Sequence, residues 1–184
     1  MEDQAMLTAV KTTDQDDRAT RVLRENARVL DRIVVSYARS EADRADLRQD
    51  IAFAFWFALP SFRGDCSERT FLLRVAHNRA LTFLSKRGVF TEDIDQHADQ
   101  VVATSGKNPA LAYERREGES ALLAAVRALP VLHRQVITLL LEGLSYREIA
   151  SVLGITETNV GVRANRARAA LRVLLEDTSA RKGC

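Results

Sequence analysis

The chain has 184 residues, of which 46% are hydrophobic and 28% are charged, and its formal net charge is +2. This balance is typical of a globular protein and excludes a disordered chain. Eight glycines and three prolines are too few for the turns of a many-stranded β fold. The two cysteines, Cys66 and Cys184, give neither a disulfide framework nor a zinc-ligand spacing, and the longest apolar run, 51–59, is too short to span a bilayer. We expect an all-α protein of the reducing cytoplasm.

The first half of the chain predicts three helices behind a polar, acidic and disordered tail, 1–17. Apolar residues recur at helical spacing over 18–39. Ser40 is placed to cap a second helix, which Pro60 ends, and Ser67 is placed to cap a third that reaches residue 86. We expect these helices to form one bundle with the core candidates Phe53, Trp56, Phe57, Leu72, Val75, Ala76 and Phe83.

The segment 89–118 reads as a flexible acidic linker. It contains Asn108-Pro109 and no sustained apolar stripe, and its acidic residues outnumber its basic residues by six to three. A structureless loop of this length is implausible inside one compact domain. We therefore divide the chain into two small helical domains, 18–88 and 119–177, followed by a short tail, 178–184.

The second domain predicts four helices and contains the most specific motif of the chain. The expected helices cover 120–128, 131–142, 146–153 and 156–175. Ser145 and Glu148 form a capping box for the third, Gly154 supplies the turn after it, and Thr156 caps the fourth. This order of cap, short helix, glycine turn and second helix is typical of a helix-turn-helix.

The last helix has two distinct faces. The predicted buried stripe consists of Val160, Ala164, Ala167 and Leu171. Polar side chains gather on another face and at the amino end, namely Thr156, Glu157, Asn159, Arg163 and Arg166. Asn and Arg can make paired hydrogen bonds to base edges in the major groove of DNA. The alternative is a helical hairpin with a solvated arginine face.

A second basic segment precedes the linker and mixes aromatic, basic and amide side chains. The stretch 67–88 contains five basic residues and only one acidic residue. Together with the loop before it, this stretch supplies the mixture of Phe62, Arg63, Asp65, Arg69, Phe71, Arg74, His77, Asn78 and Arg79. Unpaired bases stack on rings while cations hold the backbone, so such a mixture suits single-stranded nucleic acid. Phe71 by itself is more readily explained as a core residue, and the charges as solvated faces.

Taken together, these motifs resemble the extracytoplasmic-function (group 4) sigma factors of bacterial RNA polymerase. The likeness covers 18–176. It rests on a polymerase-clamp-binding segment at 46–53, a promoter-melting loop and helix at 62–65 and 69–78, and a second DNA-binding domain that includes the helix-turn-helix.

The resemblance implies a role for each segment. It implies that core polymerase is bound by Asp46, Leu47, Gln49, Asp50 and Phe53. It implies that a melted −10 element, with one base flipped into a pocket, is contacted by Phe62, Arg63, Gly64, Asp65, Arg69, Arg74 and Asn78. It implies that the −35 duplex is contacted by Thr156, Glu157, Asn159, Arg163 and Arg166. The resemblance further implies an anti-sigma partner, which can hold this cytoplasmic protein at the inner face of the membrane, and no cofactor or small-molecule substrate.

Three positions depart from the family pattern. Arg48 stands where an apolar residue is common, Phe71 where tryptophan is common, and Gly161-Val162 where Lys-Ser is common. A glycine inside a helix costs about 1 kcal/mol relative to alanine. We expect a close approach of the backbone to DNA to compensate for this cost.

Other classes of function explain less of the sequence. The three histidines are scattered, and there is no metal-ligand spacing or glycine-rich phosphate loop, so we expect no enzyme activity and no metal. The first rival is a conventional helix-turn-helix regulator, which predicts tight binding to a two-fold symmetric duplex site without polymerase. The second is a helical adaptor that binds only protein. Neither needs the aromatic-basic loop or the acidic linker.

Overall fold

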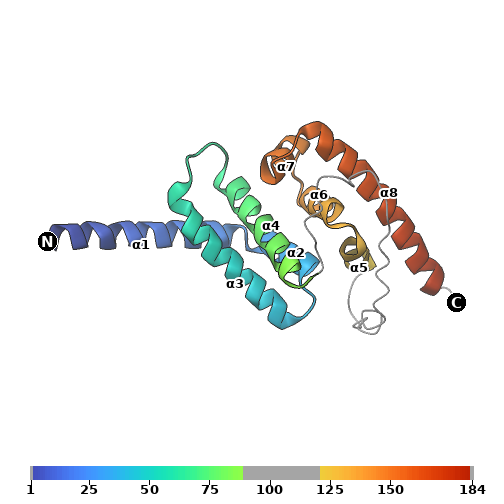
Figure 1. The fold of residues 1–184 in the computed structure, drawn as a ribbon, viewed down its shortest axis with the longest axis horizontal. Coiled ribbons are helices and arrows are strands. Elements are labelled where there is room, and N and C mark those ends of the chain that lie inside the picture. Colours follow the sequence, from blue (N-terminus) through green and yellow to red (C-terminus); the bar gives the residue numbers. More distant parts are fainter. Residues whose placement is uncertain (1, 89–120, 183–184) are drawn as a thin grey trace.

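The computed structural model describes residues 2–88 and 121–182, with side chains over 14–88 and 121–176. Within these ranges the chain is helical and has no strand, which confirms the predicted all-α class. The helices form two groups (Figure 1). The predicted linker, 89–118, lies outside the described residues.

The first group follows the predicted caps closely. It consists of α1 (Glu2–Glu25), α2 (Ala27–Tyr37), α3 (Glu41–Ala58), the short 3-10 turn η1 (Leu59–Ser61) and α4 (Glu68–Lys86). Ser40 Oγ accepts a hydrogen bond from the Asp43 N–H at 3.1 Å, and Ser67 Oγ accepts one from the Thr70 N–H at 3.1 Å. Each serine thus satisfies an amide that the first turn of its helix leaves without a partner.

The start of the chain differs from the prediction. Helix α1 begins at Glu2, where we expected a disordered tail over 1–17, and it projects from the body of the molecule (Figure 1). Its segment contains no glycine or proline, so a helix fixed by packing at its carboxyl end can propagate backwards. The single helix expected over 18–39 is interrupted at Asn26, whose side-chain amide donates to the Val22 carbonyl at 2.8 Å.

The second group consists of α5 (Ala121–Ala128), α6 (Val131–Leu141), α7 (Tyr146–Leu153) and α8 (Glu157–Lys182). All four begin within a residue or two of the predicted positions. Helix α8 continues to Lys182, beyond the expected end near residue 175 and through most of the expected tail. The next residue is Gly183, the first strong helix breaker after Gly161.

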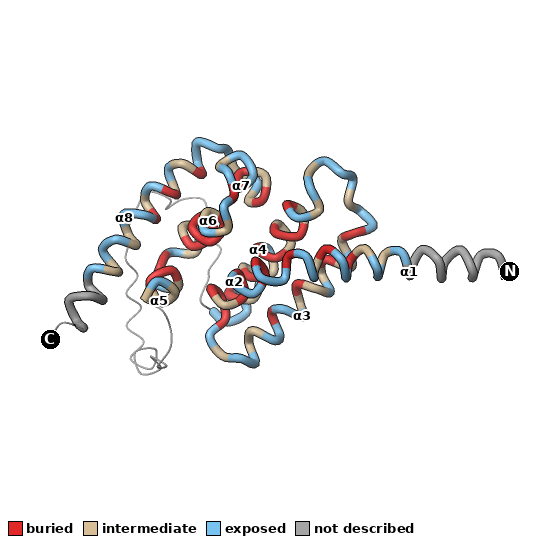
Figure 2. Tube along the Cα trace, turned by 180° about the vertical axis from the view of Figure 1, so that it is seen from behind, coloured by how far each residue is buried: buried red, intermediate tan, exposed pale blue. Residues whose placement is uncertain are grey.

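The two groups share one core. Residues with almost no exposed surface come from helices of both groups: Ile33, Val34, Leu72, Leu73, Val136, Leu139 and Ile149. Buried positions accordingly line the sides on which α2, α4, α6 and α7 meet (Figure 2). A smaller cluster of Val126, Leu129, Ile137 and Ala167 closes the second group under α8.

Two predicted core residues are not in the core. Phe53 is 57% exposed and Phe57 is 72% exposed. The inward face of α3 carries Leu47, Ile51 and Phe55, four residues apart and fully buried, so Phe53 and Phe57 lie on the opposite face. Leu72 and Ala76 are buried as predicted. No helix in the described part of the chain is long and apolar enough to cross a membrane.

Candidate nucleic-acid interface

The turn before α8 holds that helix at a fixed angle to α7. Ser145 and Glu148 form the predicted capping box: Ser145 Oγ accepts from the Glu148 N–H at 3.3 Å, and the Glu148 carboxylate accepts from the Ser145 N–H at 2.8 Å. The Ser145 hydroxyl also donates to the Glu148 carboxylate at 2.7 Å, and this hydrogen bond, together with the one from the Ser145 N–H, holds the pKa of Glu148 below its usual range. Gly154 ends α7 with φ +68°, a left-handed conformation that favours glycine. Thr156 Oγ1 then accepts from the Asn159 N–H at 3.2 Å and caps α8.

Helix α8 buries the predicted stripe. Val160, Ala164 and Ala167 are fully buried, and Leu171 is half-buried further along. Because two of these side chains are only methyl groups, α8 can approach α6 and α7 closely.

The predicted −35 residues all lie outside this buried stripe. Thr156, Glu157 and Asn159 are exposed, while Arg163 and Arg166 are half-buried. Burial lowers the pKa of the His133 imidazole on α6, and the positive charges of Arg166 and Arg163 lower it further. The amino end of α8 therefore carries hydroxyl, carboxylate, amide and guanidinium groups outside its buried stripe, and groups of these kinds can hydrogen-bond to base edges.

The loop before α4 places aromatic and polar groups together, as expected. Phe62 is half-buried, and its ring lies 5.0 Å from that of Phe71, which in turn packs on Phe55 at 6.0 Å. The Arg18 guanidinium lies 5.5 Å from the centre of the Phe62 ring. Phe62 therefore has an aromatic neighbour and a cation neighbour already, and only part of its ring is open to a base.

Three of the predicted −10 residues are exposed at the tip of this loop, namely Arg63, Gly64 and Asp65. Gly64 has φ +82°, so the turn depends on glycine at that position. On α4, Arg69 and Asn78 are exposed as well.

Arg74 departs from this arrangement. Its Nη2 atom donates to the backbone carbonyl of Ser151 on α7 at 2.7 Å, and Ser151 Oγ lies 3.5 Å away. Arg74 and Asn78 were both expected to contact the −10 element, but in this structure the Arg74 side chain is bonded to α7 while Asn78 is exposed.

The residues expected to dock on polymerase form an outward stripe on α3, with one exception. Asp46, Gln49 and Phe53 are exposed and Asp50 is half-buried. Leu47 is 1% exposed and packs in the core. The prediction for Leu47 is therefore wrong as a surface contact, because Leu47 lies on the inward face of the helix with Ile51 and Phe55.

Sequence reasoning missed one exposed residue on this stripe, Phe57, which continues it one helical turn beyond Phe53. The available signal was the regular four-residue spacing of Leu47, Ile51 and Phe55, which already filled the inward face. No group of three or more His, Cys, Asp or Glu side chains in the described residues could hold a metal ion.

Comparisons with known proteins agree with this arrangement. The family model for sigma-70 region 2 matches residues 22–89, and the model for sigma-70 region 4 matches residues 119–171. The chain is 30% identical over 183 residues to the RNA polymerase sigma-H factor of Pseudomonas aeruginosa, covering 95% of this chain and 94% of that protein. It is 31% identical over 177 residues to the ECF RNA polymerase sigma-E factor of Escherichia coli K12, covering 92% of each.

Two solved structures share the fold. The structure of CnrH in complex with the cytosolic domain of CnrY matches with a TM-score of 0.63 at 23% identity, covering 94% of this chain and 96% of that one. The sigma factor RpoE of Bartonella quintana, in complex with the anti-sigma factor NepR, matches with a TM-score of 0.61 at 23% identity, covering 89% of this chain and 97% of that one.

Proposed function

The chain belongs to the extracytoplasmic-function (ECF) sigma factors of the sigma-70 family, and from this membership we infer that it binds core RNA polymerase, directs it to particular promoters and helps to open them. It is an alternative sigma factor, and the rival reading as a conventional regulator is not favoured. The observation that carries this conclusion is the order of the two matched regions on two helical groups, with a capped helix-turn-helix in the second.

We propose that the amino end of α8 reads the −35 duplex. The hydroxyl of Thr156 and the carboxylate of Glu157 lie at the start of the helix, and Asn159 lies one turn before Arg163 and two turns before Arg166. Arg is suited to guanine and to phosphates, and Asn to adenine. The field of the helix amino terminus adds an attraction for phosphate groups.

The loop before α4 is proposed to bind the melted −10 element. The exposed residues Arg63, Gly64 and Asp65 and the partly open ring of Phe62 form one edge of a pocket for a base that leaves the stack. Extruding a base costs a few kcal/mol of stacking, which contacts in such a pocket can offset. Arg69 lies in the first turn of α4, directly after this loop, and Asn78 lies further along the same helix; both are exposed and are proposed to contact the same element.

Core polymerase is proposed to bind the outward stripe of α3. Asp46, Gln49 and Asp50 supply acidic and amide groups, and Phe53 supplies an apolar contact at the same surface. Leu47 supports this surface from inside the core.

The remaining functional properties follow as proposals. The polymerase supplies the chemistry of transcription, so the chain itself is not an enzyme and needs no cofactor. It acts in the cytoplasm with an anti-sigma partner. The support for that partner is the pair of solved complexes with the same fold, one of which contains an anti-sigma factor by name.

Transcription in vitro tests the proposed function. Purified protein is added to sigma-free bacterial core polymerase with a library of fragments from its own genome, and new transcripts are mapped. Discrete start sites that share −10 and −35 elements support the proposal. Tight binding to duplex DNA without polymerase, and no transcripts, would support the conventional regulator. Folded protein with neither activity would favour the adaptor.

A further inference from the structure

The loop proposed to bind the −10 element is held at both of its ends by α1, a helix with no role in the sites described above. Helix α1 lies across the carboxyl end of α3, close to η1 (Figure 1). Ahead of the loop, Trp56 on α3 donates its Nε1–H to Asp16 Oδ1 at 2.6 Å, and Gln15 Nε2 donates to the Trp56 carbonyl at 2.8 Å. Helix α1 is thereby fixed to the part of the chain that leads into the loop.

At the other end of the loop, α1 binds the first residue of α4, Glu68. Arg18 Nε donates to one carboxylate oxygen of Glu68 at 2.7 Å, and Arg21 Nη2 donates to the other at 2.8 Å. The hydrogen bonds from Arg21 and Arg18 hold the pKa of Glu68 below its usual range. The carboxylate is therefore charged at neutral pH, and hydrogen bonds between charged groups are stronger than neutral ones.

The position of Glu68 needs these two arginines. Glu68 is the only acidic residue in 67–88. An acid in the first turn favours the helix, but beside the proposed −10 loop it also repels the phosphates of a bound strand. Pairing with Arg18 and Arg21 offsets this repulsion, so the three side chains together are compatible with a site for nucleic acid.

Arg18 also contacts the loop itself. Its guanidinium carbon lies over the Phe62 ring, 5.5 Å from the ring centre, an arrangement in which a cation is attracted to the face of an aromatic ring. The Phe71 ring of α4 lies 5.0 Å from the same ring. Arg21 instead has Glu25 as its second partner, at 3.3 Å. Arg18 therefore links Glu68 after the loop with Phe62 inside it.

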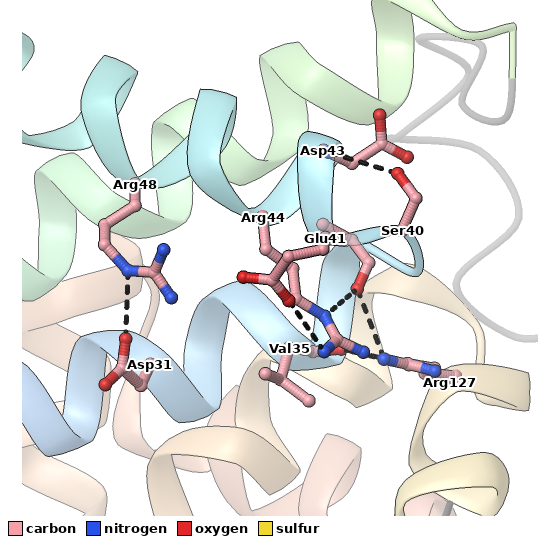
Figure 3. A network of polar contacts seen from close by, with 9 residues as sticks. Asp31, Val35, Ser40, Glu41, Asp43, Arg44, Arg48 and Arg127 are labelled. Carbon is pink, nitrogen blue, oxygen red and sulfur yellow. Dashed lines mark hydrogen bonds and ion pairs between the residues drawn. The ribbon is translucent and has the colours of Figure 1, made fainter. Parts of the chain in front are cut away.

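Other arginine pairs of the first helical group join helices away from the loop. Arg48 on α3 pairs with Asp31 on α2 at 3.0 Å, and both side chains are about half exposed (Figure 3). Exposed pairs contribute little to the stability of a whole protein, and the two pairs of Glu68 are partly exposed as well. The consequence of the Glu68 pairs is therefore local: they set the position of the loop.

We propose that Arg18 is a positioning residue of the −10 site: held by Glu68, its guanidinium covers Phe62 and fixes the loop in the shape that receives the extruded base. Arg21 supports it through the second carboxylate oxygen. This inference rests on the proposed function, because it takes the loop before α4 as the −10 site. A loop that is ordered before binding loses less conformational entropy when the base enters, so the base is bound more tightly.

Binding of single-stranded −10 oligonucleotides to the complex of core polymerase and this protein tests the proposal. The −10 sequence comes from a promoter found in the genomic screen, and a second set of oligonucleotides lacks one base at each −10 position in turn. The variants are Arg18→Ala and Glu68→Ala. The matched controls are Arg24→Ala, an exposed arginine further along α1, and Asp31→Ala, which removes the acid from the exposed pair with Arg48.

The measured quantity is the loss of affinity when a base is missing, since this ratio cancels any general attraction for phosphates. At the position of the extruded base, we expect a loss of about tenfold for the parent and for both controls. In Arg18→Ala and Glu68→Ala it should shrink to about threefold or less, which measures the coupling between the residue and the base.

Amide hydrogen exchange of the free protein provides a second readout that does not involve DNA. Residues 62–67 should exchange about threefold faster or more in Arg18→Ala and Glu68→Ala than in the parent and the controls, while the rest of the chain keeps its exchange rates. Circular dichroism checks that each variant keeps its helix content.

Two results would overturn the proposal. The first is a loss of parental size for the missing base in folded Arg18→Ala protein, even if all oligonucleotides bind more weakly. The second is unchanged exchange of residues 62–67 in both variants. If the parent complex bound −10 oligonucleotides no better than unrelated single strands, the proposed function of the loop would fail, while the exchange rates would still decide whether α1 fixes the loop.

Discussion

The rings of Tyr37 and His77 meet edge to face in the core, with their centres 6.0 Å apart and their planes at 83°. Tyr37 Oη lies 3.4 Å from His77 Nδ1, and both side chains are buried. Burial lowers the pKa of His77 to about 4 and raises the pKa of Tyr37. The folded protein therefore holds both rings in their neutral forms.

The neutral His77 makes stability depend on pH in a defined direction. In the unfolded chain a histidine has a pKa of about 6.5, above the value of about 4 in the fold. The unfolded state therefore binds the proton more readily, and stability is lost as the pH falls through about 6.5 toward 4. We expect the free energy of unfolding to fall by about 2 kcal/mol between pH 7 and pH 5 from this group alone, measured by urea denaturation.

The control for this prediction is His77→Leu, which replaces the titrating imidazole with an apolar side chain of similar volume. Its loss of stability over the same pH range should be smaller by about that amount. Part of the slope should remain, since burial also lowers the pKa of His133. If the free energy of unfolding of the parent and of a folded His77→Leu protein depended on pH in the same way, the prediction would be contradicted.

Replacing Arg163 and Arg166 together by alanine should abolish promoter-specific transcription and leave binding to core polymerase intact. A paired contact to a base edge is worth about 1–3 kcal/mol, and both arginines lie on the proposed reading face of α8. Run-off transcription from a promoter found in the genomic screen and a titration of labelled protein with core polymerase measure the two effects separately.

The matched control is Arg168→Ala with Arg172→Ala, which removes the same charge from the same helix. Arg168 is exposed, and its Nη1 atom donates to Oη of the half-buried Tyr146 at 3.1 Å. This control should weaken DNA binding modestly and equally for all sequences, because Arg168 and Arg172 are outside the proposed reading residues and contribute to the general attraction for phosphates. Unchanged transcription by the Arg163, Arg166 variant would remove α8 as the reading helix.

Asp50→Ala should weaken binding to core polymerase by about thirtyfold or more, and Phe53→Ala should have an effect of similar size. A charge that is paired at an interface costs several kcal/mol when one partner is removed, and an exposed aromatic is a frequent anchor of binding energy. Glu41→Ala is the control on the same helix, since Glu41 is exposed at the start of α3 and is not part of the stripe. Equal affinities for the parent and Asp50→Ala in a fluorescence titration would argue against this surface.

Local signals were sufficient to predict much of the architecture. Caps at Ser40, Ser67 and Ser145 and the turn at Gly154 depend on hydrogen bonds and dihedral angles within a few residues, so the sequence contains all the information they need. The buried stripe of α8 follows from the spacing of its small side chains in the same way.

Long-range contacts explain the errors. On α3, apolar residues occur on both faces, so periodicity alone could not tell that Leu47 is buried while Phe53 is exposed. Helix α1 begins early because side chains such as Gln15 find partners on α3, where its amide donates to the Trp56 carbonyl at 2.8 Å. The hydrogen bond from Arg74 to the Ser151 carbonyl joins residues 77 positions apart, and no local sequence pattern indicates it.

Gly161→Ala should stabilise the protein and reduce transcription. A Cβ atom at this position would lie 3.6 Å from Tyr146 Cε2, an ordinary van der Waals distance, so the fold does not require glycine here. Alanine in the middle of a helix is favoured over glycine by about 1 kcal/mol, which should raise the melting temperature by about 2–4 °C. If the backbone of α8 approaches DNA at this point, the added methyl group interferes with binding.

The control is Val162→Ala, which also favours the helix at an exposed neighbouring position but adds no atom. A stabilised Gly161→Ala protein with full transcription would show that the glycine does not serve contact with DNA.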